Sequence, residues 1–440
     1  MGRKKRNILL IVSAGAAVCL AAGAAVCLSA LMPVRREIAA YQADSETVDT
    51  FVEEPWEEPF VNQAALKAFE WTPEPPQPEK DTLYTYTSPE GISFISKSAA
   101  WNEKKLEALY QELLQNKHGE ELRSLLRVVV NPQEDEFAAA THQSTTQTNT
   151  FSLNFPAFPG NFGIQFEREA GVITLYGGDQ RTTVESMADS LSHEYGHHYT
   201  FYHMFPGSDA GENMLDSEYA RLRGLNEDNA LTDMSDRQYY YDHHYRYLYE
   251  IAAEDYVALM GSPRSHGIAD YCDVRDRLGG KESADYKARN AMVQENLQLP
   301  MASEQEGLAA YFYSFIDEPM PDIPPRQEIQ IQVQKGSKSY DLTDGYRTFV
   351  HYRLSWNKAY GDDATYTLVS YQPDDMYKNL YFIRTVRPGQ AADAYVGSVT
   401  REIGQTIRYM DDQLAAGTRT FIVTAVLPDG TCLLYTSRCV

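Results

Sequence analysis

Residues 191–204, LSHEYGHHYTFYHM, contain the pattern His-Glu-x-x-His, which restricts the possible folds more than any other part of the chain. On an α-helix, residues four apart lie one turn apart on nearly the same face. His193 and His197 can therefore present two imidazole nitrogens to one metal ion. Glu194 lies about 100° round the helix, where its carboxylate can accept a proton from a water activated by the metal. The pattern predicts a catalytic zinc site, with Zn²⁺ as the cofactor.

The sequence around this pattern favours a continuous helix that follows a strand. Thr182, with Glu185 three residues later, is typical of a capping box at a helix N-terminus. The run 184–204 holds no proline and one glycine, Gly196. Upstream, the alternation in residues 171–176 predicts a strand. We therefore expect a strand, a short turn and then the metal-binding helix.

Charge and hydropathy indicate where the protein acts. The 39 Lys and Arg against 62 Asp and Glu give a net charge of −23, which disfavours nucleic acid as a partner. The basic residues Arg3–Arg6 precede an uncharged apolar run, 8–32, that is long enough to span a bilayer. The basic flank predicts a cytoplasmic N-terminus and a single-pass membrane protein whose bulk is extracellular. The alternative is a cleaved signal peptide with a site near Leu28-Ser29-Ala30, which would make the protein secreted.

The five cysteines do not indicate a disulfide-rich fold. Cys19 and Cys27 lie in the apolar run, which leaves Cys272, Cys432 and Cys439 outside it. Cys432 and Cys439 are candidates for a pair, which the sequence does not decide.

Changes in composition divide the 440 residues into four parts, as expected for a chain of two or three domains. The basic tip and anchor occupy 1–35, and an acidic, Pro-rich spacer occupies 36–81. Helical and strand patterns alternate in 82–318. After a Pro-rich linker at 317–325, short β-rich runs with turn signals in 326–440 predict a β-sandwich. The fold class is therefore α+β with a separate C-terminal β-sandwich.

Within residues 82–318, the expected helices and strands follow from the apolar periodicity and from the residues that end helices and strands. We expect a strand at 92–95, a helix capped by Asn102, a helix at 120–126, a strand at 127–131, a loop at 133–150, a hairpin of strands 164–167 and 172–176, a long loop with short helical pieces at 205–234, a helix at 235–260 and mostly helical structure with loops at 265–318.

A catalytic zinc site needs three protein ligands and an open position, so a third ligand must be found. His203 stands six residues after His197, the spacing of metzincin peptidases, but Thr200 occupies the position of their turn glycine. If the helix continues, His203 lies about 80° from His193 and about 15 Å along the axis. Continuation would therefore place His203 out of reach of the metal.

The helix expected at 235–260 offers another solution. Glu250 and Glu254 share one face at a spacing of four, and Tyr247 precedes Glu254 by seven. Apolar and aromatic residues surround the two carboxylates, and the small Ala252 and Ala253 permit close helix packing. A carboxylate directed into such a contact needs a partner, and a metal ion is a suitable one.

At this point the chain resembles the zincin peptidases whose catalytic domain is like that of anthrax lethal factor. These proteins have HExxH on one helix and ExxAE on a second, and the last Glu is the third ligand. The resemblance covers about residues 90–270 and implies Glu254 as that ligand. It also implies Tyr247 as the tyrosine that faces the reaction centre and donates a hydrogen bond to the oxyanion. Asp255 departs from the pattern, so Glu250, Glu254 and Asp255 have to be distinguished.

The implied protein is a zincin-like metalloendopeptidase that takes peptides or proteins as substrates, with strand 172–176 holding the substrate as an added strand. The C-terminal region is similar to a fibronectin type III module, on the segments LSW at 354–356 and TRTFIVTAVLPDG at 418–430. Two alternatives remain open: a cell-surface adhesion or scaffold protein with a zincin-like fold, and a metzincin-type peptidase that uses His203.

Overall fold

The computed structural model describes eleven segments of the chain, which are residues 79–154, 161–205, 214–233, 235–266, 270–281, 294–296, 298–322, 327–372, 381–411, 419–428 and 432–437. The chain divides into two units, one made of Met1–Pro75 with Thr146–Arg168 and the other of Pro76–Thr145 with Glu169–Val440. The predicted anchor, nearly all of the spacer and Cys439 lie outside the described residues. Among the helices that are described, none has the length and apolarity needed to cross a membrane.

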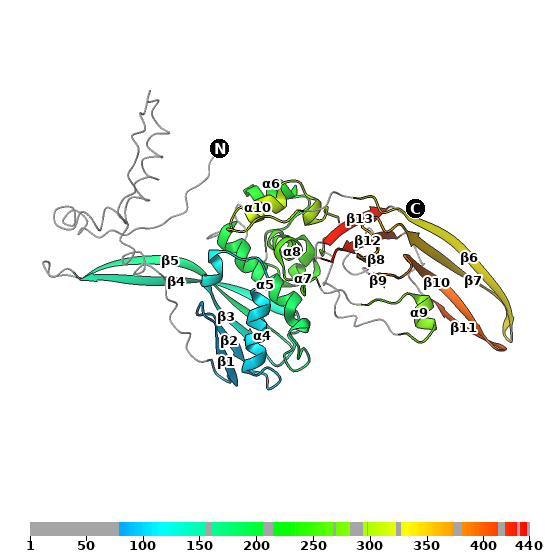
Figure 1. The fold of residues 1–440 in the computed structure, drawn as a ribbon, viewed down its shortest axis with the longest axis horizontal. Coiled ribbons are helices and arrows are strands. Elements are labelled where there is room, and N and C mark those ends of the chain that lie inside the picture. Colours follow the sequence, from blue (N-terminus) through cyan, green and yellow to red (C-terminus); the bar gives the residue numbers. More distant parts are fainter. Residues whose placement is uncertain are drawn as a thin grey trace, which may run out of the picture. The chain divides into compact units, whose positions relative to one another are not determined.

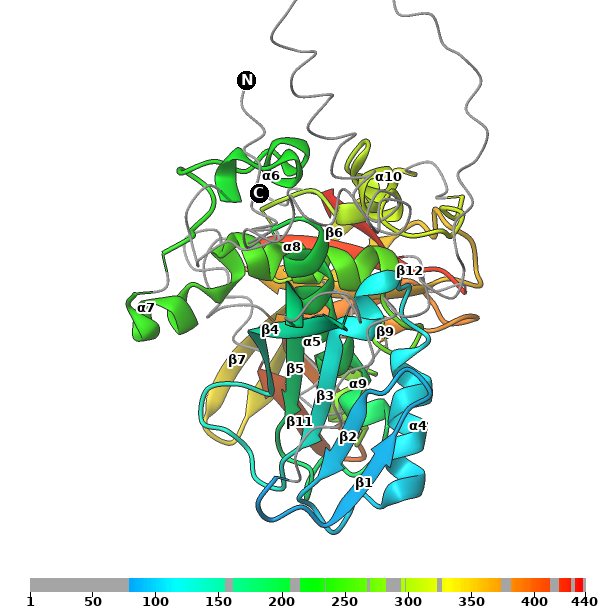
Figure 2. The ribbon, with the colours of Figure 1, turned by 90° about the vertical axis from the view of Figure 1, so that its left-hand side faces the viewer.

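The first sheet along the chain has five strands in the order β1-β2-β3-β5-β4. The strands β2, β3 and β5 run parallel, and β1 is antiparallel to β2. Figure 2 shows α4 beside β1 and β2. The strand bounds are β1 Tyr84–Thr87, β2 Ser93–Ser96, β3 Leu125–Val130, β4 Ala140–Asn154 and β5 Asn161–Leu175.

Two of these strands differ from the sequence-based expectation. The predicted loop at 133–150 is mostly strand, because β4 begins at Ala140. The predicted hairpin of 164–167 and 172–176 is one continuous strand, β5. Strand β4 is rich in Thr and Gln and lacks alternating apolar residues, so its sequence carries no burial pattern from which a strand could be predicted. It is a strand because its backbone pairs with that of β5.

The two helices nearest the sheet follow the predictions closely. Helix α4, Glu103–Leu113, is capped by the Asn102 side chain, which accepts a hydrogen bond from the Lys105 N–H. A 3₁₀ turn, η1 at Glu120–Ser124, replaces the helix expected at 120–126. Helix α5, Glu185–His203, is unbroken through the HExxH pattern.

The hydrogen-bonded pair predicted for Thr182 and Glu185 forms one residue later, while the N-cap residue of α5 itself, Val184, has no side-chain capping bond. The Thr183 hydroxyl accepts from the Ser186 N–H at 3.2 Å, and the Ser186 hydroxyl accepts from the Thr183 N–H at 3.3 Å. Serine at this position therefore closes a reciprocal pair of the kind expected between Thr182 and Glu185. The register of the helix, and hence the spacing of its histidines, is unchanged.

The helix predicted at 235–260 is divided. Helix α7, Arg237–Asp242, is followed by the turn η3, His244–Arg246, and then by α8, Leu248–Met260. The break occurs where the chain pairs with Leu231, whose N–H donates to Arg246 O and whose carbonyl accepts from Leu248 N–H. This backbone pairing overrides the helical propensity of the segment.

The remaining helical elements of the described residues are short. They are η2 Met214–Asp216, α6 Glu218–Arg223, α9 Val274–Leu278, η4 Ala302–Glu304 and α10 Leu308–Tyr313. The described part of 265–318 is therefore less helical than predicted.

Close packing of α5 on α8 positions the candidate site (Figure 1). A Cβ at Gly196 would lie 2.9 Å from the carbonyl oxygen of Ala253, a distance that real side chains do not tolerate. Glycine in the middle of HExxH and the small Ala253 opposite it therefore let the two backbones approach. The approach brings the carboxylates of α8 onto the histidines of α5.

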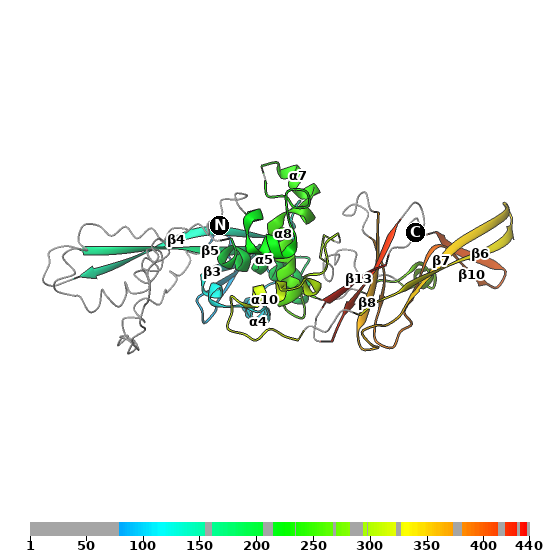
Figure 3. The ribbon, with the colours of Figure 1, turned by 90° about the horizontal axis from the view of Figure 1, so that it is seen from above.

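In the described part of the C-terminal region, the strands form two four-stranded sheets, of order β11-β10-β7-β6 and β13-β12-β8-β9. Figure 3 shows β6, β7 and β10 of the first sheet beside one another. The apolar residues of the two sheets, including Leu354, Val396, Tyr366 and Val423, form a core separate from that of the α5 region. This confirms the predicted β-rich region. The strands are β6 Ile331–Leu342, β7 Gly345–Trp356, β8 Thr365–Tyr371, β9 Tyr381–Val386, β10 Asp393–Ile403, β11 Thr406–Asp411, β12 Thr420–Val426 and β13 Cys432–Ser437.

Candidate metal centre

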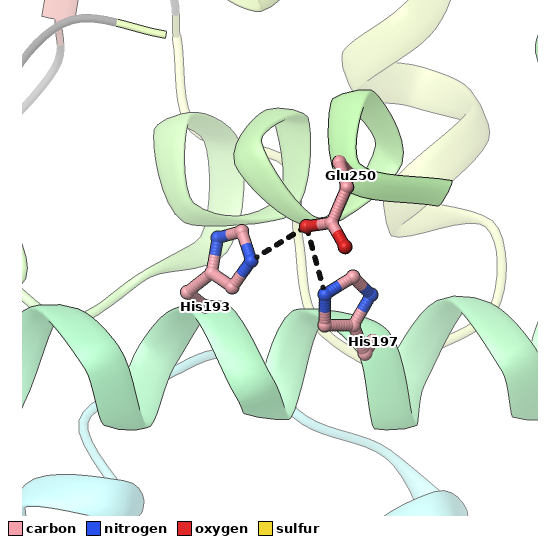
Figure 4. Close-up of side chains that lie close together, drawn as sticks. All are labelled: His193, His197 and Glu250. Atoms are coloured by element: carbon pink, nitrogen blue, oxygen red, sulfur yellow. Dashed lines mark hydrogen bonds and ion pairs between the residues drawn. The ribbon is translucent and has the colours of Figure 1, made fainter. Parts of the chain in front are cut away.

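Two imidazoles and one carboxylate converge between α5 and α8. The Nε2 atoms of His193 and His197 lie 3.0 and 3.1 Å from the Oε2 atom of Glu250. Figure 4 shows the two rings rising from one helix toward the carboxylate of the other. The three side chains form a group whose potential ligand atoms all lie within 4.8 Å of one another.

The donor set suits zinc. In a tetrahedral site with bonds of about 2.0–2.1 Å, neighbouring ligand atoms are separated by about 3.3 Å. The nitrogen–oxygen distances at Glu250 are 3.0 and 3.1 Å, so a small adjustment would place all three atoms around one ion. Two imidazoles and a carboxylate are also the ligands of one common type of catalytic zinc site.

The third member of the group is Glu250 rather than Glu254, the residue predicted as a ligand. Glu254 lies one helical turn further along α8, and its Oε1 atom is 2.8 Å from Nδ1 of His193. That nitrogen is on the side of the ring away from Nε2. Glu254 therefore contacts His193 on the side of the ring opposite Glu250, where a carboxylate fixes the ring orientation and increases the basicity of the imidazole.

The pKa values of the two glutamates differ in a way that agrees with their positions. Burial raises the pKa of Glu254 to about 7, and His193 opposes this only in part. Burial also acts to raise the pKa of Glu250, but His244, His197 and His193 outweigh it and hold that pKa well below its usual range. Glu250 is thus the carboxylate that stays ionised and available to a cation.

Glu194 lies beside this group, as predicted, and not in it. Its side chain is buried, at 6% exposure, and burial raises its pKa while the neighbouring imidazoles of His197 and His193 oppose the rise. Within the described part of the chain, its carboxylate has no hydrogen-bond partner. The carboxylate is therefore free to accept a proton.

Tyr247 does not face the metal group. Its hydroxyl donates to the backbone oxygen of Asp233 at 3.0 Å, and its ring is 1% exposed. The tyrosine that does face the group is Tyr240, on α7, whose hydroxyl donates to Oε1 of Glu250 at 2.6 Å. The break between α7 and α8 explains the difference, because the seven-residue spacing assumed one continuous helix.

His203 and Asp255 belong to other clusters. Because α5 continues to its end, Nε2 of His203 lies 2.8 Å from Oε2 of Glu121 and the ring stacks on Phe315. Asp255 is fully buried and accepts two hydrogen bonds from Arg223 and one from Tyr219. Both side chains are thus engaged away from the metal group.

The sequence-based prediction missed a third imidazole at the site. Nε2 of His244 lies 3.1 Å from Oε2 of Glu250, and Nδ1 lies 2.7 Å from Oε2 of Glu295. The adjacent pair His243-His244, shortly before the acidic helix, was an available signal for it. No feature of the sequence around Glu295 pointed to the site.

Comparison with protein-family models, with curated proteins and with solved structures found no match. The function is therefore inferred from the positions and chemistry of the side chains. Of these, the shared focus of His193, His197 and Glu250 is the most specific.

Proposed function

We propose that this chain is a zinc-dependent metallopeptidase. The observation that supports the proposal most strongly is the grouping of His193, His197 and Glu250, with the unpartnered carboxylate of Glu194 beside it. Three protein ligands leave a fourth position open, as catalytic rather than structural zinc sites do. The HExxH pattern supplies the same chemistry from the sequence.

Each side chain has a distinct part in the reaction. A zinc ion held by His193, His197 and Glu250 would supply Lewis acidity, which lowers the pKa of water and polarises a peptide carbonyl. Glu194 accepts the proton of the attacking water and passes it to the leaving amine. Tyr240 and Glu254 hold Glu250 and His193 in orientation through their hydrogen bonds.

The substrate would bind as an extended strand along β4. Residues 172–175 of the predicted template, strand 172–176, lie within β5, which has β3 on one side and β4 on the other and so has no open edge. β4 is at the end of the sheet order and offers its backbone groups to an added strand. His142 of β4 stacks near His197, with ring centroids 6.3 Å apart, so this edge lies beside the metal ligands.

The finer fold assignments are part of the proposal. A twisted sheet beside an HExxH helix, and a second helix that supplies a glutamate, support a zincin-like catalytic domain resembling that of lethal factor. The two antiparallel sheets, with connections that cross between them, support the fibronectin type III-like assignment. The proposal also includes a membrane anchor at residues 8–32, which rests on the apolar sequence and its basic flank.

Replacing Glu194 with Gln tests the proposed chemistry. The variant loses the base and keeps all metal ligands, so hydrolysis of an unfolded protein substrate should fall by roughly a hundredfold or more. Zinc content and melting temperature should match the wild type. A variant that retains most of the wild-type rate would contradict the proposed mechanism.

A binding role at the cell surface is the second candidate. Four of the eight exposed large hydrophobic residues of the described chain lie in one C-terminal sheet, at Val333, Tyr346, Ile403 and Tyr409. A sheet that exposes several large apolar side chains is a candidate contact surface. The same assay separates the candidates, because a zinc-loaded wild-type chain that cleaves no unfolded protein would favour the binding role.

A further inference from the structure

Two hairpins of the C-terminal region end beside each other, and both ends expose a large apolar side chain. The β6–β7 hairpin turns just before Tyr346, which is 74% exposed, and the β10–β11 hairpin turns just after Ile403, which is 45% exposed. Figures 1 and 3 show both turns at the same end of this sheet. The hydroxyl of Tyr340 joins the hairpins by hydrogen bonds with Thr400 and Glu402. The two turns therefore form one exposed apolar end of the sheet.

The β10–β11 hairpin separates its charges between two faces. Its register places Arg401 directly opposite Arg408. Because side chains alternate along a strand, four uncharged residues share the face of these arginines, which are Val399, Ile403, Thr406 and Met410. The acids of the paired segment 398–411, Glu402 and Asp411, lie on the opposite face. Tyr409 shares that opposite face and packs on the ring of a β7 phenylalanine, with centroids 4.9 Å apart. The face with the arginines is thus free of acids.

Arg401 and Arg408 differ from the other three arginines on the described strands of these sheets. Arg347, Arg353 and Arg384 each have a nitrogen within 3.0 Å of an aspartate oxygen. The side chains of Arg401 and Arg408 are exposed and form no hydrogen bond or ion pair with any described residue. Like charges directly opposite each other on neighbouring strands destabilise a sheet. An anionic group bound between the two guanidinium groups would relieve this repulsion.

We propose that this end of the C-terminal sheet docks on the surface of an anionic phospholipid bilayer. Ile403 and Tyr346 enter the interfacial layer, which stabilises apolar and tyrosine side chains. The guanidinium groups of Arg401 and Arg408 donate hydrogen bonds to lipid phosphate oxygens. Since the net charge of −23 repels most of the chain from such a surface, the acid-free face determines which part makes contact. This role depends neither on the peptidase chemistry nor on the predicted anchor.

The apolar side chains favour a bilayer over a soluble phosphate polymer as the partner. Both partners offer phosphate groups to Arg401 and Arg408. Only a bilayer also offers an apolar layer to Ile403 and Tyr346, the two side chains at the turns. The combination of exposed apolar residues with unpaired arginines is therefore the observation that selects the lipid surface.

Hydrogen exchange in the full chain measures this contact locally, whether or not another segment also holds the chain on a vesicle. The chain is incubated with vesicles of phosphatidylglycerol and phosphatidylcholine, with vesicles of phosphatidylcholine alone, and with inorganic polyphosphate at the same phosphate concentration. We expect exchange of the turn amides of residues 403–406 to slow at least about fivefold with the anionic vesicles and with neither of the others. Salt at about 1 M should weaken the effect, because it screens charges beyond about 3 Å.

Two double variants with equal charge loss test the arginine pair. Arg401→Gln with Arg408→Gln should lower the affinity for anionic vesicles about 30-fold, at roughly fivefold for each basic side chain near such a surface. Lys335→Gln with Lys338→Gln removes the same charge from β6, the other edge strand of the sheet, and should lower it less than about threefold.

A single variant tests the apolar contact with both arginines in place. Ile403→Ser should weaken vesicle binding roughly tenfold, because an apolar side chain no longer enters the interface. All three variants should keep the melting temperature of the wild type and its hydrolysis of a soluble unfolded protein, since the changed side chains lie outside the candidate metal centre.

The outcomes decide between the bilayer and its alternatives. Unchanged vesicle affinity in the arginine variant, or an equal loss in the lysine variant, would overturn the role of the arginine pair. Protection by polyphosphate as strong as that by anionic vesicles would make the ligand a phosphate polymer and overturn docking on a bilayer. Absence of protection in the wild type would also overturn it. The peptidase function is measured separately on the soluble substrate, so it can fail or succeed independently of this role.

Discussion

Two clusters of histidine and carboxylate side chains lie on opposite sides of α5. They differ in the groups that contact the carboxylate oxygens. On one side, His193 and His197 face Glu250. On the other, Oε2 of Glu121 lies against Nε2 of His203, and the backbone oxygen of Glu121 against His198. The residue types are nearly the same, so composition alone does not distinguish a metal site from a structural contact.

The hydrogen-bond partners of the two carboxylates make the distinction. Glu121 is fully buried, and its two oxygens are satisfied by the Gly119 N–H, the Tyr195 hydroxyl and His203. At Glu250, three imidazole Nε2 atoms crowd onto the single oxygen Oε2. Convergence of several lone pairs on one point is the arrangement that a cation stabilises. The Glu250 cluster is therefore the one we propose for metal binding, and the Glu121 cluster is a structural contact.

The comparison is tested most strongly by removing each carboxylate's charge. Glu250→Gln should lower zinc affinity by orders of magnitude, because a carboxylate–metal bond is lost in a partly desolvated site. Glu121→Gln should leave zinc affinity unchanged. Isothermal titration with Zn²⁺ measures both, and equal losses in the two variants would abolish the distinction drawn between the clusters.

The third acid of α8 gives the next largest effect, on stability rather than on zinc. Asp255→Ala leaves the guanidinium of Arg223 buried without its partner, so the free energy of unfolding should fall by about 3–5 kcal/mol. Double replacement with Arg223→Met should recover part of this loss. Urea titration measures the change, and a variant as stable as the wild type would show that the pair contributes little.

Glu254 should have an intermediate effect on the metal. It supports His193 from the far side of the ring, and loss of such a partner lowers metal affinity about 10- to 100-fold. We therefore expect zinc affinity in Glu254→Gln to fall between that of the wild type and that of Glu250→Gln. If Glu254→Gln loses more affinity than Glu250→Gln, Glu254 is the ligand, as the sequence-based resemblance implied.

The smallest expected effect is that of Glu121 on stability, and it depends on pH. Burial acts to raise the pKa of Glu121, but hydrogen bonds from His203, the Gly119 N–H and Tyr195 outweigh it and lower the pKa. The stabilisation is therefore present above the unfolded value of 4.5 and is lost as the pH falls through the lower folded value. Glu121→Gln should cost about 1–2 kcal/mol at neutral pH.

The pH dependence provides its own control. The stability difference between wild type and Glu121→Gln should shrink in acid, where the wild-type carboxyl is protonated. Glu120→Gln, next to it and exposed, should show neither effect. A difference that grows in acid would mean that the folded-state pKa of Glu121 is raised instead of lowered.

The sequence predicted those elements whose formation is decided locally. Helices α4 and α5 were found from apolar spacing and caps, and the pairing of His193 with His197 follows from one helical turn. Strand β4 was missed because its polar sequence has no burial pattern. The break before α8 was missed because it depends on pairing with Leu231, a contact from outside the segment.

The choice between Glu250 and Glu254 shows a different limit. The two residues share one face of α8, so periodicity places both toward α5 and cannot rank them. Their roles depend on which residues of α8 lie opposite His193 and His197 of α5. The close contact of Gly196 with Ala253 sets this alignment of the two helices. Tertiary packing of this kind, together with the docking of Glu295 on His244, is not encoded in any local pattern.

Anomalous diffraction from crystals of the protein soaked in zinc salt tests the central claim most directly. The account predicts one zinc peak in the α5–α8 region, about 2.0–2.2 Å from Nε2 of His193, Nε2 of His197 and a carboxylate oxygen of Glu250. Glu254 should contact only Nδ1 of His193. No peak at this position, or a peak between Glu121 and His203, would contradict it.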